Sequence, residues 1–224
     1  MRALAILIWK DLIIEARTRE LVTSMSLVAF IALVIVSLAF APSPSIAARL
    51  APGILWMTMA FTATLGLGRA HALEQEHQAL QGLLLTPVSR SLLFLGKFGA
   101  NLLLVALVQL MVVIVFGVLF APEMSGRATW LAPPLALGAV GFTAVGTLLG
   151  AMTATTRLRE VLLPVLLLPV VLPVIILSLA GLSAVVEGRP ISELFRSLKL
   201  LAAVDIIYVV LGAWLFEYVV EDWA

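Results

Sequence analysis

Residues 98–120 read FGANLLLVALVQLMVVIVFGVLF, a stretch without a single charged side chain. Roughly 20 consecutive apolar residues suffice for a helix to cross the hydrocarbon core of a bilayer. The stretch is apolar throughout and does not alternate with polar residues, which favours a helix over a strand. Five further segments of this kind cover 21–41, 51–68, 130–152, 160–181 and 200–220. The sequence therefore predicts an all-α membrane protein with six transmembrane helices.

The composition supports the same fold class. Apolar residues make up 62% of the chain and charged residues 12%, whereas soluble globular proteins carry about 25% charged residues. Six spans and their connections fill most of the 224 residues, so we expect a single transmembrane domain over 1–224. The net charge of +1 does not indicate a nucleic-acid partner. The absence of cysteine excludes disulfides, thiolate catalysis and iron–sulfur clusters.

Residues 1–20 are predicted to form an amphipathic helix that lies in the inner membrane interface. Charged residues such as Glu15 fall on one side of the helical wheel, and apolar residues such as Trp9 fall on the other. A cleaved signal peptide is the alternative, because Ala39-Phe40-Ala41 resembles a small-residue cleavage site. The long lead-in of mixed charge and the Pro42 directly after that site favour an uncleaved first span.

The distribution of basic residues predicts the orientation of the chain. If the N-terminus is inside, five basic residues lie outside, namely Arg49, Arg127, Arg189, Arg196 and Lys199. The other nine of the 14 then lie inside, namely Arg2, Lys10, Arg17, Arg19, Arg69, Arg90, Lys97, Arg157 and Arg159. Cytoplasmic connections are enriched in Lys and Arg. We therefore expect both termini to be cytoplasmic.

The longest inner connection runs from Arg69 to Lys97 and is predicted to contain an amphipathic helix. Its apolar residues share a face at helical spacing, and Pro87 ends the helix. The face is formed by Ala70, Leu73, Leu80 and Leu84. An exposed apolar ridge of this kind indicates that another protein docks there.

A further amphipathic segment lies outside, between the fifth and sixth spans. Pro190 suits a first helical turn, and apolar residues follow at i, i+3, i+4 and i+7. These residues are Ile191, Leu194, Phe195 and Leu198. We expect a helix that lies flat on the outer surface.

No catalytic motif emerges from the sequence. Glu74-x-x-His77 has the i, i+3 spacing of di-iron helix bundles, but the second copy that such a site needs is missing. We therefore predict a solvated or partner-facing helix there and no metal site. Gly96-Lys97 is not a phosphate loop, because Ser91 stands where the first glycine is required. The chain is predicted to be no enzyme and to hydrolyse no ATP.

A few residues within the spans could carry a function. Asp205, about one turn below the outer surface, is either a functional intramembrane carboxylate or an interfacial residue with access to water. Gly146 and Gly150 form a GxxxG pair for close helix contact, within the chain or across a dimer. Three prolines make the fifth span either a hinge or a static fit to its neighbours. They are Pro164, Pro169 and Pro173.

Three motifs carry a resemblance to a known family. They are Ala51-Pro52-Gly53-Ile54-Leu55-Trp56, then 81–90 (QGLLLTPVSR) with Leu95-Gly96-Lys97, and 162–169 (LLPVLLLP). Together they resemble CcmB, the B subunit of the haem exporter of bacterial cytochrome c maturation. The resemblance extends over essentially the whole chain, and 81–97 is its most specific part.

The resemblance implies a non-catalytic ABC-2-type permease subunit in the bacterial inner membrane. It implies a separate cytoplasmic ATPase, CcmA, which binds the ATP, and a second copy of the permease. It also implies the subunits CcmC and CcmD, which handle haem for the periplasmic chaperone CcmE, so that this chain binds no cofactor itself. In the family, the segment between spans two and three couples the permease to the ATPase. On this chain the coupling residues are then Leu73, Glu74, Glu76, Leu80, Leu84 and Arg90, with the N-terminal helix as a second contact.

Two alternative functions stay open at this point. The first is an ABC-2 permease that exports a drug, a lipid or a polysaccharide. The second is a membrane-embedded enzyme, which would need polar residues clustered at a common depth. The spans supply only Asp205, Gln109, Asn101 and scattered hydroxyl groups.

Overall fold

The computed structural model describes residues 2–40, 44–76, 88–120, 128–154, 156 and 158–221, and within these ranges the chain is almost entirely helical. The helices are α1 (Arg2–Thr18), α2 (Glu20–Phe40), α3 (Pro44–Glu76), α5 (Arg90–Phe120), the 3₁₀ turn η1 (Ala128–Leu131), α6 (Ala132–Thr153), α7 (Arg159–Val186) and α8 (Ile191–Glu221). Six of them are long and apolar enough to cross a membrane. The prediction of an all-α, six-span protein is confirmed.

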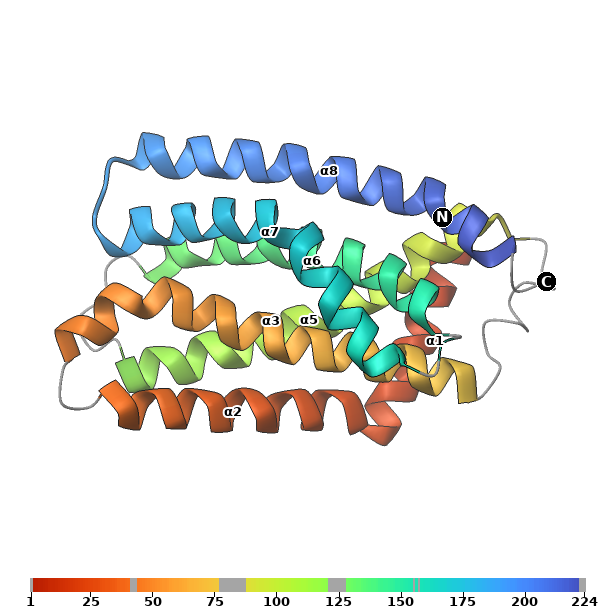
Figure 1. Cartoon of the computed structure of the whole chain (residues 1–224), viewed down its shortest axis with the longest axis horizontal. Coiled ribbons are helices and arrows are strands. Elements are labelled where there is room, and N and C mark those ends of the chain that lie inside the picture. Colours follow the sequence, from red (N-terminus) through yellow and green to blue (C-terminus); the bar gives the residue numbers. More distant parts are fainter. Residues whose placement is uncertain are drawn as a thin grey trace.

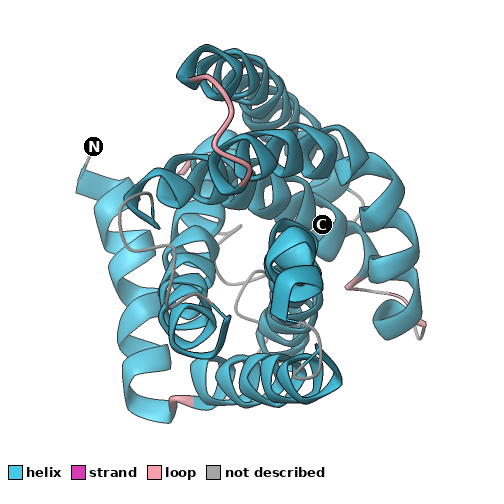
Figure 2. Cartoon of the chain, turned by 90° about the vertical axis from the view of Figure 1, so that its left-hand side faces the viewer, coloured by secondary structure: helices cyan, strands magenta, loops and turns pink. Residues whose placement is uncertain are grey.

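The six long helices form one bundle, and α1 packs against one end of it. Figure 1 shows α2, α3, α5, α6, α7 and α8 running along the long axis, with α1 lying across one end. Helix α8 also ends there, at Glu221, and we call this the termini end; Figure 2 views the bundle from the opposite end. An even number of spans brings the two ends of a chain to the same side.

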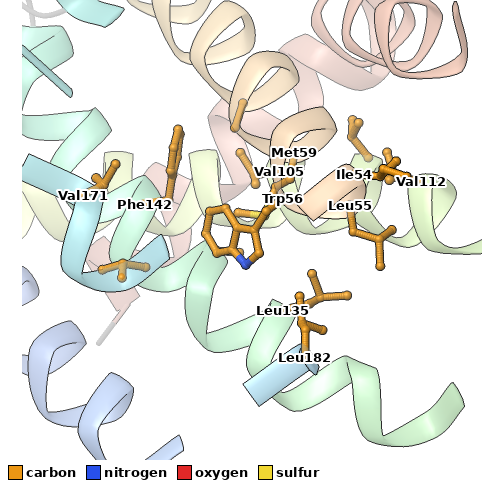
Figure 3. Close-up of a cluster of buried hydrophobic side chains, with 14 of the residues drawn as sticks. Ile54, Leu55, Trp56, Met59, Val105, Val112, Leu135, Phe142, Val171 and Leu182 are labelled. Carbon is orange, nitrogen blue, oxygen red and sulfur yellow. The ribbon is translucent and has the colours of Figure 1, made fainter. Parts of the chain in front are cut away.

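Two helices occupy the centre of the bundle. In α6, 67% of the spanning residues are buried, and in α3 61% are, against 17–28% in the other four spans. Helix α6 contains small residues that allow this enclosure; a Cβ at Gly138, for example, would overlap the Trp56 ring. Figure 3 shows Trp56 among the side chains of this core. The outer four helices expose apolar side chains, as helices that face lipid do.

The second span is longer than the sequence predicted. The segment from Arg69 to Glu76 continues α3 and is not a separate helix, and Arg90 already begins α5. The reason is local: no Gly or Pro lies between Arg69 and Glu76, so the helix does not end where its polarity rises. The remaining part of the predicted coupling helix, residues 77–87, lies outside the described ranges.

The predicted flat helix on the outer surface is not a separate element. Its residues form the first turns of α8, which runs unbroken from Ile191 to Glu221. No Gly or Pro occurs from Ile191 until Gly212, so the chain contains no signal for a break. The reversal from α7 is made before it, at Gly188, which has a φ of 69° that glycine adopts readily.

Candidate functional site

The coupling residues predicted from the sequence are only partly described. Leu73 lies in the last turns of α3 and is half-buried. Glu74 and Glu76 belong to the same helix end, but their side chains are outside the description, as are Leu80 and Leu84 altogether. Arg90 begins α5, and its Nη1 donates to the carbonyl oxygen of Glu217 in α8 at 3.5 Å. The structure therefore places Arg90 beside α8.

Helix α1 packs across the start of α5 on a surface made of glycines. A Cβ at Gly96 would lie 2.9 Å from the Cβ of Leu7, and one at Gly99 would lie 2.7 Å from Cδ1 of Ile8. Both distances are shorter than an ordinary carbon–carbon contact. The glycines thus let the two helices approach closely, and α1 is a packed element of the termini end.

A buried ion pair fixes the same contact. Lys97 of α5 is 5% exposed, and its Nζ lies 3.2 Å from Oδ2 of Asp11 in α1. The other oxygen of Asp11 lies 2.8 Å from Nζ of Lys10. A buried ammonium group is tolerated where a carboxylate compensates its charge. The position of α1 is therefore set by charge as well as by packing.

The joint between α1 and α2 is a single residue. Arg19 has a φ of 54°, a left-handed conformation that ends α1, and α2 begins at the next residue. The carboxylate of Glu15 is buried and accepts a hydrogen bond from the backbone N–H of Val22 at 2.8 Å. A carboxylate at this place satisfies a free N–H of the first turn and complements the positive end of the helix dipole.

Two cavities flank the end of α3. The first, which we call the junction pocket, has a volume of about 270 Å³ and lies between α1, α2, α3 and α5; Asp11, Glu15, Leu73 and Asn101 are among its lining residues. The second, of about 620 Å³, lies between α2, α3 and α7 and includes the ion pair of Arg69 with Glu20. Leu73 lines both cavities. The one coupling residue whose side chain is described in α3 therefore lies where α1 meets the bundle.

Polar side chains inside the bundle are bonded across helices. Trp56 Nε1 donates to Ser178 Oγ at 2.8 Å, and Ser178 Oγ donates to the carbonyl of Pro134 at 2.6 Å, which joins α3, α7 and α6. Asn101 Nδ2 donates to Thr147 Oγ1 at 3.1 Å and joins α5 to α6. Pro134 and Thr147 are 13 residues apart in α6, so these bonds join the helices at two levels of the bundle.

His71 is buried, although the sequence pattern placed it on a polar face. Its Nδ1 lies 2.8 Å from the carbonyl oxygen of Leu67, and its ring covers Gly150 of α6. His71 is enclosed because α3 continues as a packed helix at this point. His77, the other half of the histidine pair, lies outside the described ranges.

The GxxxG pair of α6 contacts α3. A Cβ at Gly146 would overlap the side chain of Leu67, and one at Gly150 would overlap the ring of His71. Of the two contacts that the sequence left open, the structure shows the one within the chain.

The three prolines lie inside one continuous helix that bends. Helix α7 contains Pro164, Pro169 and Pro173, and Figure 1 shows it changing direction midway. Proline lacks the N–H of the helix ladder and clashes with the preceding turn, which bends a helix. The hydroxyl of Tyr208 in α8 donates to the carbonyl of Val170 at 2.6 Å, between two of these prolines. The bend is thus held by α8.

Asp205 is buried between α8 and its neighbours. It is the fifteenth residue of α8 and is 3% exposed, which does not fit the alternative of an interfacial residue with access to water. Its carboxylate lies against Gly141 of α6, where a Cβ would overlap both it and Val174 of α7. Among the described residues, neither of its oxygens has a hydrogen-bond partner.

The end of the bundle opposite the termini carries a separate charged group. Arg189 Nη2 lies 2.7 Å from Oε2 of Glu187, and its Nη1 lies 3.6 Å from Oε2 of Glu193. The hydrogen bond to Glu187 raises the pKa of Arg189 above its ordinary value. A pocket of about 580 Å³ is lined by Arg189 and Trp130, among others. Glu187, Arg189 and Glu193 are all exposed.

Sequence reasoning missed several of these residues. The Asp11–Lys97 pair joins positions far apart in the chain, and no local sequence pattern indicates that the two residues meet. The contact of Tyr208 with the bend of α7 had no sequence signal, because it depends on how α7 and α8 pack.

The fold and these contacts define a multi-pass membrane protein with a packed central helix pair and a charged junction at its termini end. The family model described as CcmB protein matches residues 1–221, and the chain belongs to this family. No curated protein matches it. Membership implies a non-catalytic, multi-pass permease subunit of an ABC-type haem exporter for cytochrome c maturation, in the inner membrane. It also implies a complex with an ATPase and other Ccm subunits.

Proposed function

We propose that this chain receives the movement of a separate, CcmA-like ATPase at its termini end and passes it to the bundle. The movement serves haem delivery, or the release of the haem-loaded periplasmic chaperone, together with CcmC-like and CcmD-like subunits. ATP is bound by the ATPase and haem by the partner subunits. A second copy of the chain completes the permease.

The observation that carries this proposal is the attachment of α1. Lys97 and Asp11 tie α1 to α5, and Leu73 at the end of α3 lines the same junction pocket. A force applied near Leu73 therefore acts on α1, α3 and α5 together. The proposal requires the termini end to be cytoplasmic, which the excess of Lys and Arg on that side supports.

Affinity capture of the chain from a mild detergent, together with the ATPase, tests the proposal. We expect Leu73→Glu, alone or with Leu80→Glu and Leu84→Glu, to reduce the captured ATPase at least tenfold, while the permease still inserts at normal yield. Ile191→Glu is the matched control, because Ile191 is an exposed apolar residue at the opposite end. Capture of the ATPase at full yield by the triple variant, or labelling of residues 70–90 from the periplasm, would contradict the proposal.

The absence of a haem ligand on this chain is part of the proposal. His71 is held by the carbonyl of Leu67 and covered by α6, which leaves its ring no room for a porphyrin. We expect the purified chain to show no haem absorbance. Stable haem absorbance that His71→Ala or His77→Ala removes would contradict this expectation.

A further inference from the structure

Asp205 lies midway along α8, on the side that faces α6 and α7. Gly141 of α6 leaves room for its carboxylate, and Val174 of α7 closes the site from the other side. The side chain is 3% exposed, and neither carboxylate oxygen has a hydrogen-bond partner in the described part of the chain. The carboxylate is therefore enclosed between helices, with Gly141 and Val174 beside it.

No charge from the surrounding helices compensates this carboxylate. Helix α6 contains no Asp, Glu, Lys, Arg or His. The charged residues of α7 are Arg159 and Glu160, which lie 15 and 14 residues before Val174, roughly 20 Å along the helix. On α8, Lys199 and Glu217 are exposed, six residues before and twelve after Asp205. The titratable side chain that faces Asp205 from its own helix is Tyr208, whose hydroxyl donates to the carbonyl of Val170.

An ionised carboxylate in such surroundings is strongly unfavourable. A buried charge without a partner loses its hydration and gains nothing in return, so the group takes up a proton instead. The alternative, an ion pair like that of Asp11 with Lys97, would need a basic side chain that none of the three helices supplies here.

We propose that Asp205 is an intramembrane proton-binding site. In the packed arrangement of α6, α7 and α8, its carboxyl group is neutral and holds one proton. Separation of α8 from Gly141 admits water, and the proton then leaves to that water. Rearrangement of these three helices is therefore linked to the binding and release of one proton, whichever partner drives the rearrangement.

The chain offers an unusually clean test, because it contains three aspartates, Asp11, Asp205 and Asp222. NMR of protein labelled with ¹³C-aspartate in lipid nanodiscs reports the protonation state of each carboxyl carbon. We expect one signal at the position of a neutral carboxyl at neutral pH, missing from Asp205→Asn and kept in Asp11→Asn and Asp222→Asn. Three signals at the ionised position, or a neutral signal that Asp205→Asn keeps, would overturn the proposal.

The test remains decisive even if Asp205→Asn does not fold. The wild-type spectrum alone decides whether a neutral aspartate exists, and the two control variants assign it by exclusion if Asp205→Asn misfolds. No ATPase or haem is present in the experiment, so its outcome is independent of the coupling proposal.

Discussion

The aspartate at the termini end and the aspartate in the middle of the bundle have opposite electrostatic surroundings. Asp11 is held between Lys97 and Lys10 and fixes α1 to α5. Asp205 faces Gly141 and Val174 without a hydrogen-bond partner among the described residues. A paired charge sets the geometry of two elements, whereas an unpaired one makes the packing around it depend on a proton. The fixed joint and the protonatable site thus lie in different parts of the chain.

The strongest test of this contrast is removal of the Asp11 charge. Asp11→Asn removes the carboxylate by which α1 contacts Lys97, and we expect a loss of about 2 kcal/mol in the docking of α1. Complete breakage of a buried pair costs about 3–5 kcal/mol, and Asp11 retains some exposure. Hydrogen exchange of the α1 amides measures the loss.

Lys10→Met is the control for that experiment. Lys10 contacts the same carboxylate, but its side chain is 37% exposed against 6% for Lys97, so we expect a change below about 0.5 kcal/mol. Equal effects of the two variants would show that the buried pair does not hold α1.

A smaller effect is expected at the bend of α7. Tyr208→Phe removes the hydrogen bond to the carbonyl of Val170 and keeps the ring, which should lower the free energy of unfolding by about 1 kcal/mol. Thermal unfolding in detergent measures this change. Tyr218→Phe, at an exposed position of the same helix, should leave the midpoint unchanged. If Tyr218→Phe lowered the unfolding midpoint by the same amount, the hydrogen bond of Tyr208 would not be what stabilises the bend.

The smallest effect is expected at Asp205 itself. If its carboxyl group is neutral, Asp205→Leu replaces one uncharged side chain by another and breaks no hydrogen bond. The free energy of unfolding should then change by less than about 1 kcal/mol, because removal of an unsatisfied polar group offsets the cost of fitting the larger Leu beside Gly141. The same thermal assay measures it. A loss comparable to that of Asp11→Asn would show that Asp205 is charged and paired, and the contrast would disappear.

The sequence predicted which segments cross the membrane but not where their helices end. Apolar content identifies 98–120 as a span, since that property is local. The continuation of α3 through Arg69 to Glu76 is also local in origin, but a change from apolar to polar residues looks like a loop when no partner is visible. The same holds for Ile191–Lys199, whose amphipathic pattern fits both a flat helix and the first turns of a longer one.

The contacts of the candidate site were harder to foresee, for a different reason. The burial of His71 depends on Gly150, which follows it by 79 positions, and the depth of Asp205 depends on where α8 begins. A helical wheel describes the faces of one helix, not what a second helix places against them. Leu73 was identified from its own apolar face, whereas its place beside α1 became visible only in the packed bundle.

The joint at Arg19 has a mechanical consequence. A flexible linker would let α1 move without disturbing α2. Here the single left-handed residue Arg19 connects the two helices, and the carboxylate of Glu15 in α1 accepts a hydrogen bond from the N–H of Val22 in α2. There is no slack to absorb a displacement. A displacement of α1 is therefore transmitted directly to α2 as a rotation, and α2 is one of the outer helices of the bundle.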